Sequence, residues 1–192
     1  MDNHIKNTVK CCHFHLRNIG KIRRFLTQDS TTKLVHAFIS SRLDYNNALL
    51  YGLPKSQINK LQRIQNTAAR IVTSATKSEH ITPYLKELHW LPVEYRIQFK
   101  INTLTYRCLN NLAPQYLCDL LQKYQPPKRL RSSSVTQLVV PKTRLSGYGD
   151  RAFSKASPTL WNSLPASVQQ QKTLASFRVG LKTHLYRKAF SD

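Results

Sequence analysis

The chain is poor in acidic residues: nine Asp and Glu stand against thirty Lys and Arg in 192 residues. The nine carboxylates are dispersed, and no two are adjacent. A polymerase or nuclease that works with two metal ions needs clustered carboxylates to hold them. The sequence therefore predicts no such catalytic centre. Asp44, which precedes Tyr45, is interpreted as a structural residue at a helix end, because one carboxylate cannot hold two metals.

Glycine is also scarce, and the five glycines are scattered. They form neither the G-x-G-x-x-G nor the G-x-x-x-x-G-K loop that cradles phosphates. The chain contains no G-x-S-x-G elbow, and no cysteine lies in a recognised nucleophile signature. We therefore predict that this chain is not itself an enzyme and that it needs no cofactor.

Long apolar runs are missing as well. No stretch approaches the roughly 18 apolar residues of a membrane span, and charged residues interrupt the start of the chain where a signal peptide would lie. The four cysteines include an adjacent pair, which seldom forms a disulfide. Free thiols are typical of a reducing compartment. We expect an intracellular protein, in the nucleus or the cytoplasm, with no membrane partner.

Cysteine and histidine cluster at only one place, and the cluster is Cys11, Cys12, His13 and His15. Zinc sites usually need two ligand pairs, each with a turn-sized gap, and no second pair follows at that spacing. We interpret Cys12 as a buried thiol with exposed histidines around it, and we predict no metal site.

What the chain does have is charge of one sign. Its formal net charge is +21, which costs stability through self-repulsion. A polyanionic partner relieves that cost, and RNA or DNA is the commonest one. The 41% content of hydrophobic residues is enough to build a core. The composition indicates a folded protein that binds the nucleic-acid backbone without sequence preference.

Apolar residues recur at spacings of three and four through most of the chain, which is typical of helices. Ser30 and Ser56 are candidate N-caps, and prolines 83, 92 and 114 stand where helices begin. We predict a mainly α fold, in which a helical bundle is followed by a smaller, irregular, basic region that ends in a helix. The predicted helices lie in the ranges 5–19, 30–43, 56–71, 93–108, 114–121 and 174–185, and another begins at Thr82-Pro83.

Composition divides the chain into three predicted parts, 1–75, 76–122 and 123–192. Residues 74–81 are polar and read as a linker, and composition shifts again at Pro126-Pro127. Residues 137–140 favour a short strand that ends at Pro141. No acidic residue lies between Leu120 and Gly149, so this window is a candidate basic segment.

Basic side chains on helix faces and in loops can contact phosphates without reading bases. Tyr124 and Tyr148 lie near such residues and could stack on unpaired bases. The candidate nucleic-acid-binding residues are Arg17, Lys21, Arg23, Arg24, Lys60, Arg63 and Arg70 in the helices, and Lys128, Arg129, Arg131, Lys142 and Arg144 in the acid-free window.

Seven collinear segments carry a family resemblance: FHLRNIGKIRRFL (14–26), LVHAFISSRLDYNNALLYGLP (34–54), LQRIQNTAARIV (61–72), HITPYLKELHWLPVEYRIQFKI (80–101), LTYRCLNNLAPQYLCDLL (104–121), LVVPKTRLSGYGDRAFSKASPTLWNSLP (138–165) and LKTHLYRKAF (181–190). Together they resemble the C-terminal region, thumb and post-polymerase extension, of the reverse transcriptase of LINE-type (non-LTR) retrotransposons. The resemblance covers nearly the whole chain.

This resemblance implies that residues 5–73 form a thumb-like helical region that grips the template–primer duplex through its backbone. The polymerase palm, with its Asp-Asp motif, lies upstream in the family and has no match here, and neither does the endonuclease. The missing palm is an expected partner. The chain is thus predicted to be a non-catalytic, nucleic-acid-binding fragment; the alternatives are a helical protein-interaction module and a non-functional translated remnant.

Overall fold

The computed structural model describes residues 1–125 and 136–191, and most of them are helical, which confirms the mainly α class. The chain forms two compact units: Met1–Arg96 with the C-terminal residues from Ala189, and Ile97–Lys188. The division lies within helix α6 (Val93–Leu109), whereas the composition predicts divisions after residues 75 and 122. Composition changes mark loops, and a boundary inside a continuous helix leaves no such mark.

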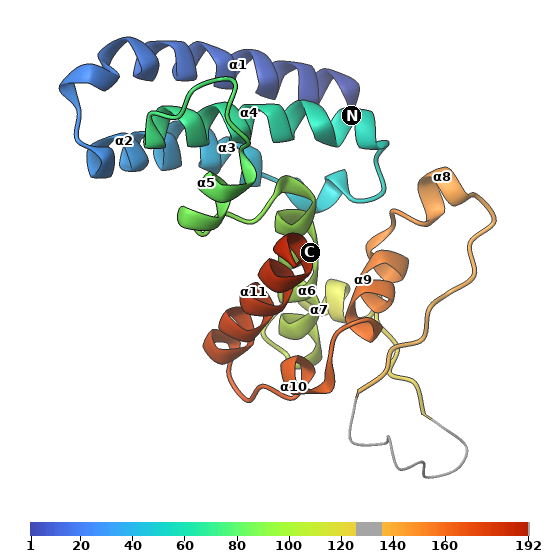
Figure 1. The fold of residues 1–192 in the computed structure, drawn as a ribbon. Helices are drawn as coiled ribbons and strands as arrows, with labels where there is room; N and C mark the ends of the chain where they lie inside the picture. Colours follow the sequence, from blue (N-terminus) through green and yellow to red (C-terminus); the bar gives the residue numbers. More distant parts are fainter. Residues whose placement is uncertain (126–135, 192) are drawn as a thin grey trace. The chain divides into compact units, whose positions relative to one another are not determined.

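The first unit is built on two parallel helices, α1 (Asp2–Ile22) and α4 (Lys55–Thr73), which pack side by side (Figure 1). Gln57 at the start of α4 donates a hydrogen bond to Asp2 at the start of α1. At the other end, Arg23 donates to the carbonyl oxygen of Ile71. After α1, the chain runs back through α2 (Gln28–Val35), the π-helical turn η2 (His36–Ser40) and α3 (Ser41–Asp44) before α4 begins.

Burial follows the predicted apolar stripes in these helices. On α1 the buried side chains include Ile5, Cys12, Leu16 and Ile19, at the helical spacing seen in the sequence. The buried stripe of α4 consists of Leu61, Ile64, Gln65, Ala68, Ala69 and Val72. Both helices therefore hold one apolar side inward and leave the opposite side to solvent.

Two predicted helix caps are wrong. Thr27, not Ser30, caps α2: its backbone is extended, and its hydroxyl oxygen accepts from the Ser30 amide at 3.2 Å. A cap residue must lie just outside the helix, and Ser30 already lies in the first turn. Helix α4 begins at Lys55 after Pro54, without a side-chain cap from Ser56.

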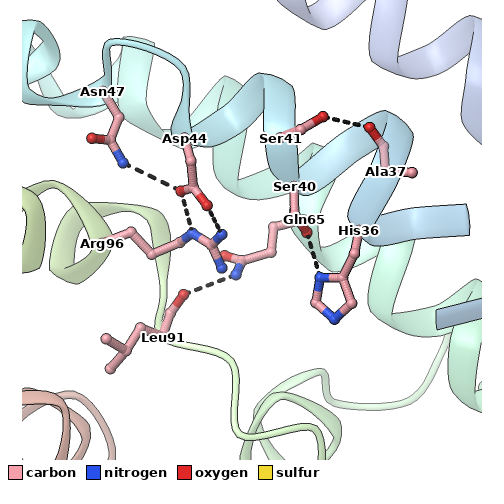
Figure 2. Close-up of polar contacts among 9 residues, drawn as sticks. All are labelled: His36, Ala37, Ser40, Ser41, Asp44, Asn47, Gln65, Leu91 and Arg96. Atoms are coloured by element: carbon pink, nitrogen blue, oxygen red, sulfur yellow. Dashed lines mark hydrogen bonds and ion pairs between the residues drawn. The ribbon is translucent and has the colours of Figure 1, made fainter. Parts of the chain in front are cut away.

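A partly buried polar network, shown in part in Figure 2, joins the start of α6 and the chain before it to α4 and α3. The Gln65 side-chain amide donates to the Leu91 carbonyl oxygen at 2.8 Å, and the Gln62 side-chain carbonyl accepts from the Val93 amide at 2.8 Å. Nearby, both carboxylate oxygens of Asp44 accept from the Arg96 guanidinium. Asp44, the last residue of α3, therefore has a structural role as the ion-pair partner of Arg96.

We expect Gln65→Leu to lower the free energy of unfolding by about 1–3 kcal/mol, because the Leu91 carbonyl would lose its donor in a site closed to water. Leucine is similar in size, so the loss reports the hydrogen bonds more than a cavity. Urea unfolding followed by circular dichroism measures it. The matched control is Asn59→Leu on the exposed side of α4, which should stay within about 0.5 kcal/mol of the parent. Equal stability of both variants would contradict the role of Gln65.

The second unit is centred on Phe177 of helix α11 (Leu174–Phe190). The Phe177 ring is fully buried and stacks on Tyr106 of α6, with 4.3 Å between ring centroids, and on Trp161 at 5.8 Å. A buried hydroxyl pair, Thr105 and Ser157, joins α6 to helix α9 (Phe153–Asn162) at 2.6 Å. Short helices complete the unit: α7 (Gln115–Cys118), α8 (Ser146–Gly149) and α10 (Ala166–Gln169).

The C-terminal region is more helical than its sequence pattern predicts, because α9 and α10 precede the terminal helix. Pro158 lies inside α9, and because proline usually breaks helices, the sequence pattern does not predict a helix there. Pro158 is buried, as is Trp161 on the same helix, so packing outweighs the poor helix propensity of proline.

The predicted strand at 137–140 is wrong. Leu138 forms only an isolated antiparallel bridge with Lys123. Its other edge is occupied by the Asn162 side chain, which accepts from the Leu138 amide and donates to the Leu138 carbonyl oxygen. A side-chain amide thus takes the place of a second strand, so no ladder forms in the described residues.

In the part of the chain that the structure describes, no helix has the length and apolar character of a membrane span.

Candidate nucleic-acid interface

Helix α1 carries a line of exposed cations on the side away from its buried stripe. They are Lys6, Lys10, Arg17 and Lys21, at spacings of four, seven and four residues. These spacings return to the same side of an α-helix. At 1.5 Å of rise per residue, the line extends for about 22 Å. A row of this kind can follow the phosphates of one nucleic-acid strand.

Helix α4 adds Lys60 and Arg63, which are also exposed. The hydrogen bond from Gln57 to Asp2 and the approach of Ile71 to Gly20 identify the side of each helix that meets the other. With the helices parallel, the helical phase then places both cations on the same side as the α1 line, opposite α2 and α3. We call this set the basic face: Lys6, Lys10, Arg17, Lys21, Lys60 and Arg63.

The basic face is not neutralised by neighbouring carboxylates. No acidic residue lies in the ranges 3–28 or 45–78, which contain all of α1 after Asp2 and all of α4. Within the described residues the ion pairs lie elsewhere, between Lys33 and Asp29, Arg96 and Asp44, and Lys155 and Asp150. The uncompensated charge gives the face a positive potential, which would attract a polyanion.

Arg23 and Arg70 have different surroundings from the other predicted contacts. The Arg23 guanidinium donates to the carbonyl oxygens of Ile71 and Val72 at 2.8 and 3.1 Å, so it satisfies free carbonyls at the end of α4. Arg70 donates to the carbonyl oxygens of Thr76 and Glu79 and holds the loop after α4. We leave both out of the basic face.

Arg24 follows α1 and is exposed, with its guanidinium 4.7 Å from the centre of the Phe25 ring. The ring lies beneath the cation, and such a pair offers a flat surface as well as a charge. Arg24 is therefore available to solvent, just beyond the end of the α1 line.

The second group of predicted nucleic-acid-binding residues lies in the acid-free window between Leu120 and Gly149. Lys142 and Arg144 are exposed, and Lys128, Arg129 and Arg131 lie outside the described residues. Thr143 lies between Lys142 and Arg144, and its hydroxyl donates to Asp150 at 2.7 Å and accepts from Lys155 at 2.8 Å. A Cβ on Gly149 would lie 2.7 Å from the Cβ of Thr143, so this close approach requires glycine. Tyr124 and Tyr148 are exposed in the same window.

Lys6 and Lys10 belong to the basic face, but they are not among the contacts predicted from the sequence. Their signal is the helical phase they share with Arg17 and Lys21, which was available in the sequence. What the sequence did not supply was the direction of α4, and this decides which cations of the two helices share a side.

In the cysteine and histidine cluster, the predicted burial of Cys12 is confirmed, and the predicted exposure of the histidines holds for His13 but not for His15. Cys12 is buried, and burial raises the pKa of its thiol to about 11. Cys11 and His13 are exposed, whereas His15 is half-buried and stacks on Phe38, with 4.9 Å between ring centroids. Among the described residues no group of three or more His, Cys, Asp or Glu is placed to hold a metal ion.

Comparison of this chain with family models, with curated protein sequences and with solved structures finds no match.

Proposed function

We propose that this chain is a non-catalytic nucleic-acid-binding fragment of a LINE-type reverse transcriptase, in which the first unit contacts the backbone of a template–primer duplex. The observation that carries the proposal is the basic face, because it brings six exposed cations onto one side of two parallel helices. The sequence resemblance supports the same role, since it assigns these residues to the thumb. The palm of the parent polymerase is the proposed protein partner.

The basic face suits backbone contact better than base recognition. Lys and Arg side chains reach phosphates as charged donors, and phosphates carry no sequence information. The uncompensated charge of α1 and α4 favours the release of counterions from the duplex, which drives non-specific binding. In the intact enzyme this would hold the duplex while the palm performs the chemistry.

We expect the affinity for an RNA–DNA duplex to fall by about 1,000-fold between 50 and 200 mM salt, which corresponds to about six phosphate contacts. Fluorescence anisotropy with a labelled duplex measures this change. A duplex of the same length and scrambled sequence should bind equally well. Equal affinity at both salt concentrations would contradict the proposal.

Competition tests the protein-interaction module as an alternative. Excess unlabelled duplex of unrelated sequence should displace the bound duplex, and an acidic peptide of equal charge should not. The opposite result would favour a module that binds an acidic protein surface.

A further inference from the structure

A second feature of the first unit lies on the side of α1 that faces α3. An open groove of about 580 Å³ runs there between α1 and the segment formed by η2 and α3. The volume lies within the range of about 300–1,000 Å³ that is usual for small-ligand pockets. Its lining includes His4, Thr8, Cys11, Phe38, Arg42 and Tyr45.

Two aromatic rings of the groove remain open to solvent. Phe38 is 41% exposed and Tyr45 is 66% exposed. Phe38 is held in place because it stacks on His15, with 20° between the ring planes. Phe14 meets the edge of the same His15 ring and is itself 62% exposed. The rings form a series of flat surfaces that extends from the exposed side of α1 to the groove.

The π-helical turn sets the direction of the groove side chains. A π turn contains one residue more than an α turn, so it rotates every later residue by about 100°. Here the turn spans His36–Ser40, and Arg42 and Tyr45 follow it. Without the extra residue, their side chains would point elsewhere. Such turns are frequent at functional sites.

The chemistry of the lining favours a nucleic acid over an apolar peptide. Among the described residues, those that line the groove include no Leu, Ile, Val or Met and no carboxylate. Arg42, whose guanidinium lies 3.4 Å from the His15 ring nitrogen, is a cation in the lining. The neighbouring Asp44 is paired with Arg96. Flat rings beside a cation suit an occupant with unpaired bases and phosphates.

We propose that this groove binds a single-stranded segment of nucleic acid, with bases stacked on Phe38 and Tyr45 and a phosphate on Arg42. The inference rests on the proposed function, because the basic face would hold the duplex that adjoins the single strand. The groove thus adds a preference for the junction between duplex and single strand.

The test compares the whole chain with its Tyr45→Ala and Phe38→Ala variants. The probes are a labelled oligouridylate and a labelled blunt RNA–DNA duplex. Each variant should bind the oligouridylate roughly 5- to 150-fold more weakly, since this is the range for loss of one stacking ring. Both variants should bind the duplex as the parent does. Tyr45→Phe keeps the ring and should bind both probes as the parent does.

Two failures are distinguishable. If the parent binds neither probe, the proposed function is wrong and the groove inference falls with it. If the parent binds the duplex with steep salt dependence but both alanine variants bind oligouridylate normally, only the groove inference is wrong. Thermal melts verify that each variant is folded, and Tyr45→Phe guards against a purely structural effect.

Photo-cross-linking supplies an independent readout. A 4-thiouridine-substituted oligouridylate should form its main adduct within residues 37–45, located by mass spectrometry of the digested complex. Adducts confined to the basic face would overturn the proposal. A groove that binds an aromatic peptide, with loss of that binding in Tyr45→Ala but no loss of oligouridylate binding, would be a protein docking site and would also overturn it.

Discussion

Replacing Lys10, Arg17, Lys21 and Arg63 together by Gln should weaken RNA–DNA duplex binding by about 1,000-fold at about 0.1 M salt. All four are exposed members of the basic face, and none of them takes part in an ion pair within the described residues. Each lost phosphate contact removes close to one released counterion, so the salt slope should become shallower by about 3 to 4. Titrations by anisotropy at several salt concentrations measure both quantities.

The matched control removes the same charge elsewhere. Lys33, Lys77, Arg178 and Lys182 are exposed and lie outside the basic face, and their replacement by Gln lowers the net charge equally. We expect this control to lose less than about 10-fold in affinity, because only long-range attraction is reduced. If both variants lost the same affinity, binding would depend on net charge and the basic face would have no special role.

Phe177→Ala should lower the free energy of unfolding by about 3–5 kcal/mol, the range for loss of a fully buried aromatic ring. Phe177 is fully buried and stacks on both Tyr106 and Trp161, so its removal leaves a cavity at the centre of the second unit. The neighbouring rings cannot fill the space without giving up their own contacts. Urea unfolding measures the loss, and hydrogen exchange should show it in α6, α9 and α11.

Val179→Ala is the matched control for Phe177. Val179 lies on the same helix and is 69% exposed, so its truncation should change stability by less than about 0.5 kcal/mol. Phe177→Leu should fall between the two, because part of the apolar volume remains. A cost below about 1 kcal/mol for Phe177→Ala would show that the stacked rings are not the centre of this unit.

Much of the helical structure could be predicted from local periodicity. The apolar stripe from Ile5 to Ile19 predicts α1, because the side of a helix that packs in the core must be apolar. The pattern failed where tertiary contacts replaced local signals. Gln65 lies in a buried stripe because the Leu91 carbonyl accepts from it, and Leu138 lacks a full strand because Asn162 occupies its edge. Both partners are more than twenty residues away in the chain.

The candidate site was predictable in part. Arg17, Lys21, Lys60 and Arg63 were identified from their residue type and their position off the apolar stripe. The separate environment of Arg23 was not predictable, because its acceptors lie at the end of another helix. The groove was not predictable either, since His4 lies on α1 and Tyr45 follows α3, and the two line one groove only after the chain has reversed.

The helical class and the large excess of cations follow from periodicity and composition, which are local properties of the chain. How that excess is arranged depends on the packing of the helices. The parallel packing of α1 and α4 places six of the cations on one side, and the π-helical turn directs Phe38, Arg42 and Tyr45 to another. The physical reason is that the direction of a helix and the phase of its far end depend on contacts between segments distant in the chain.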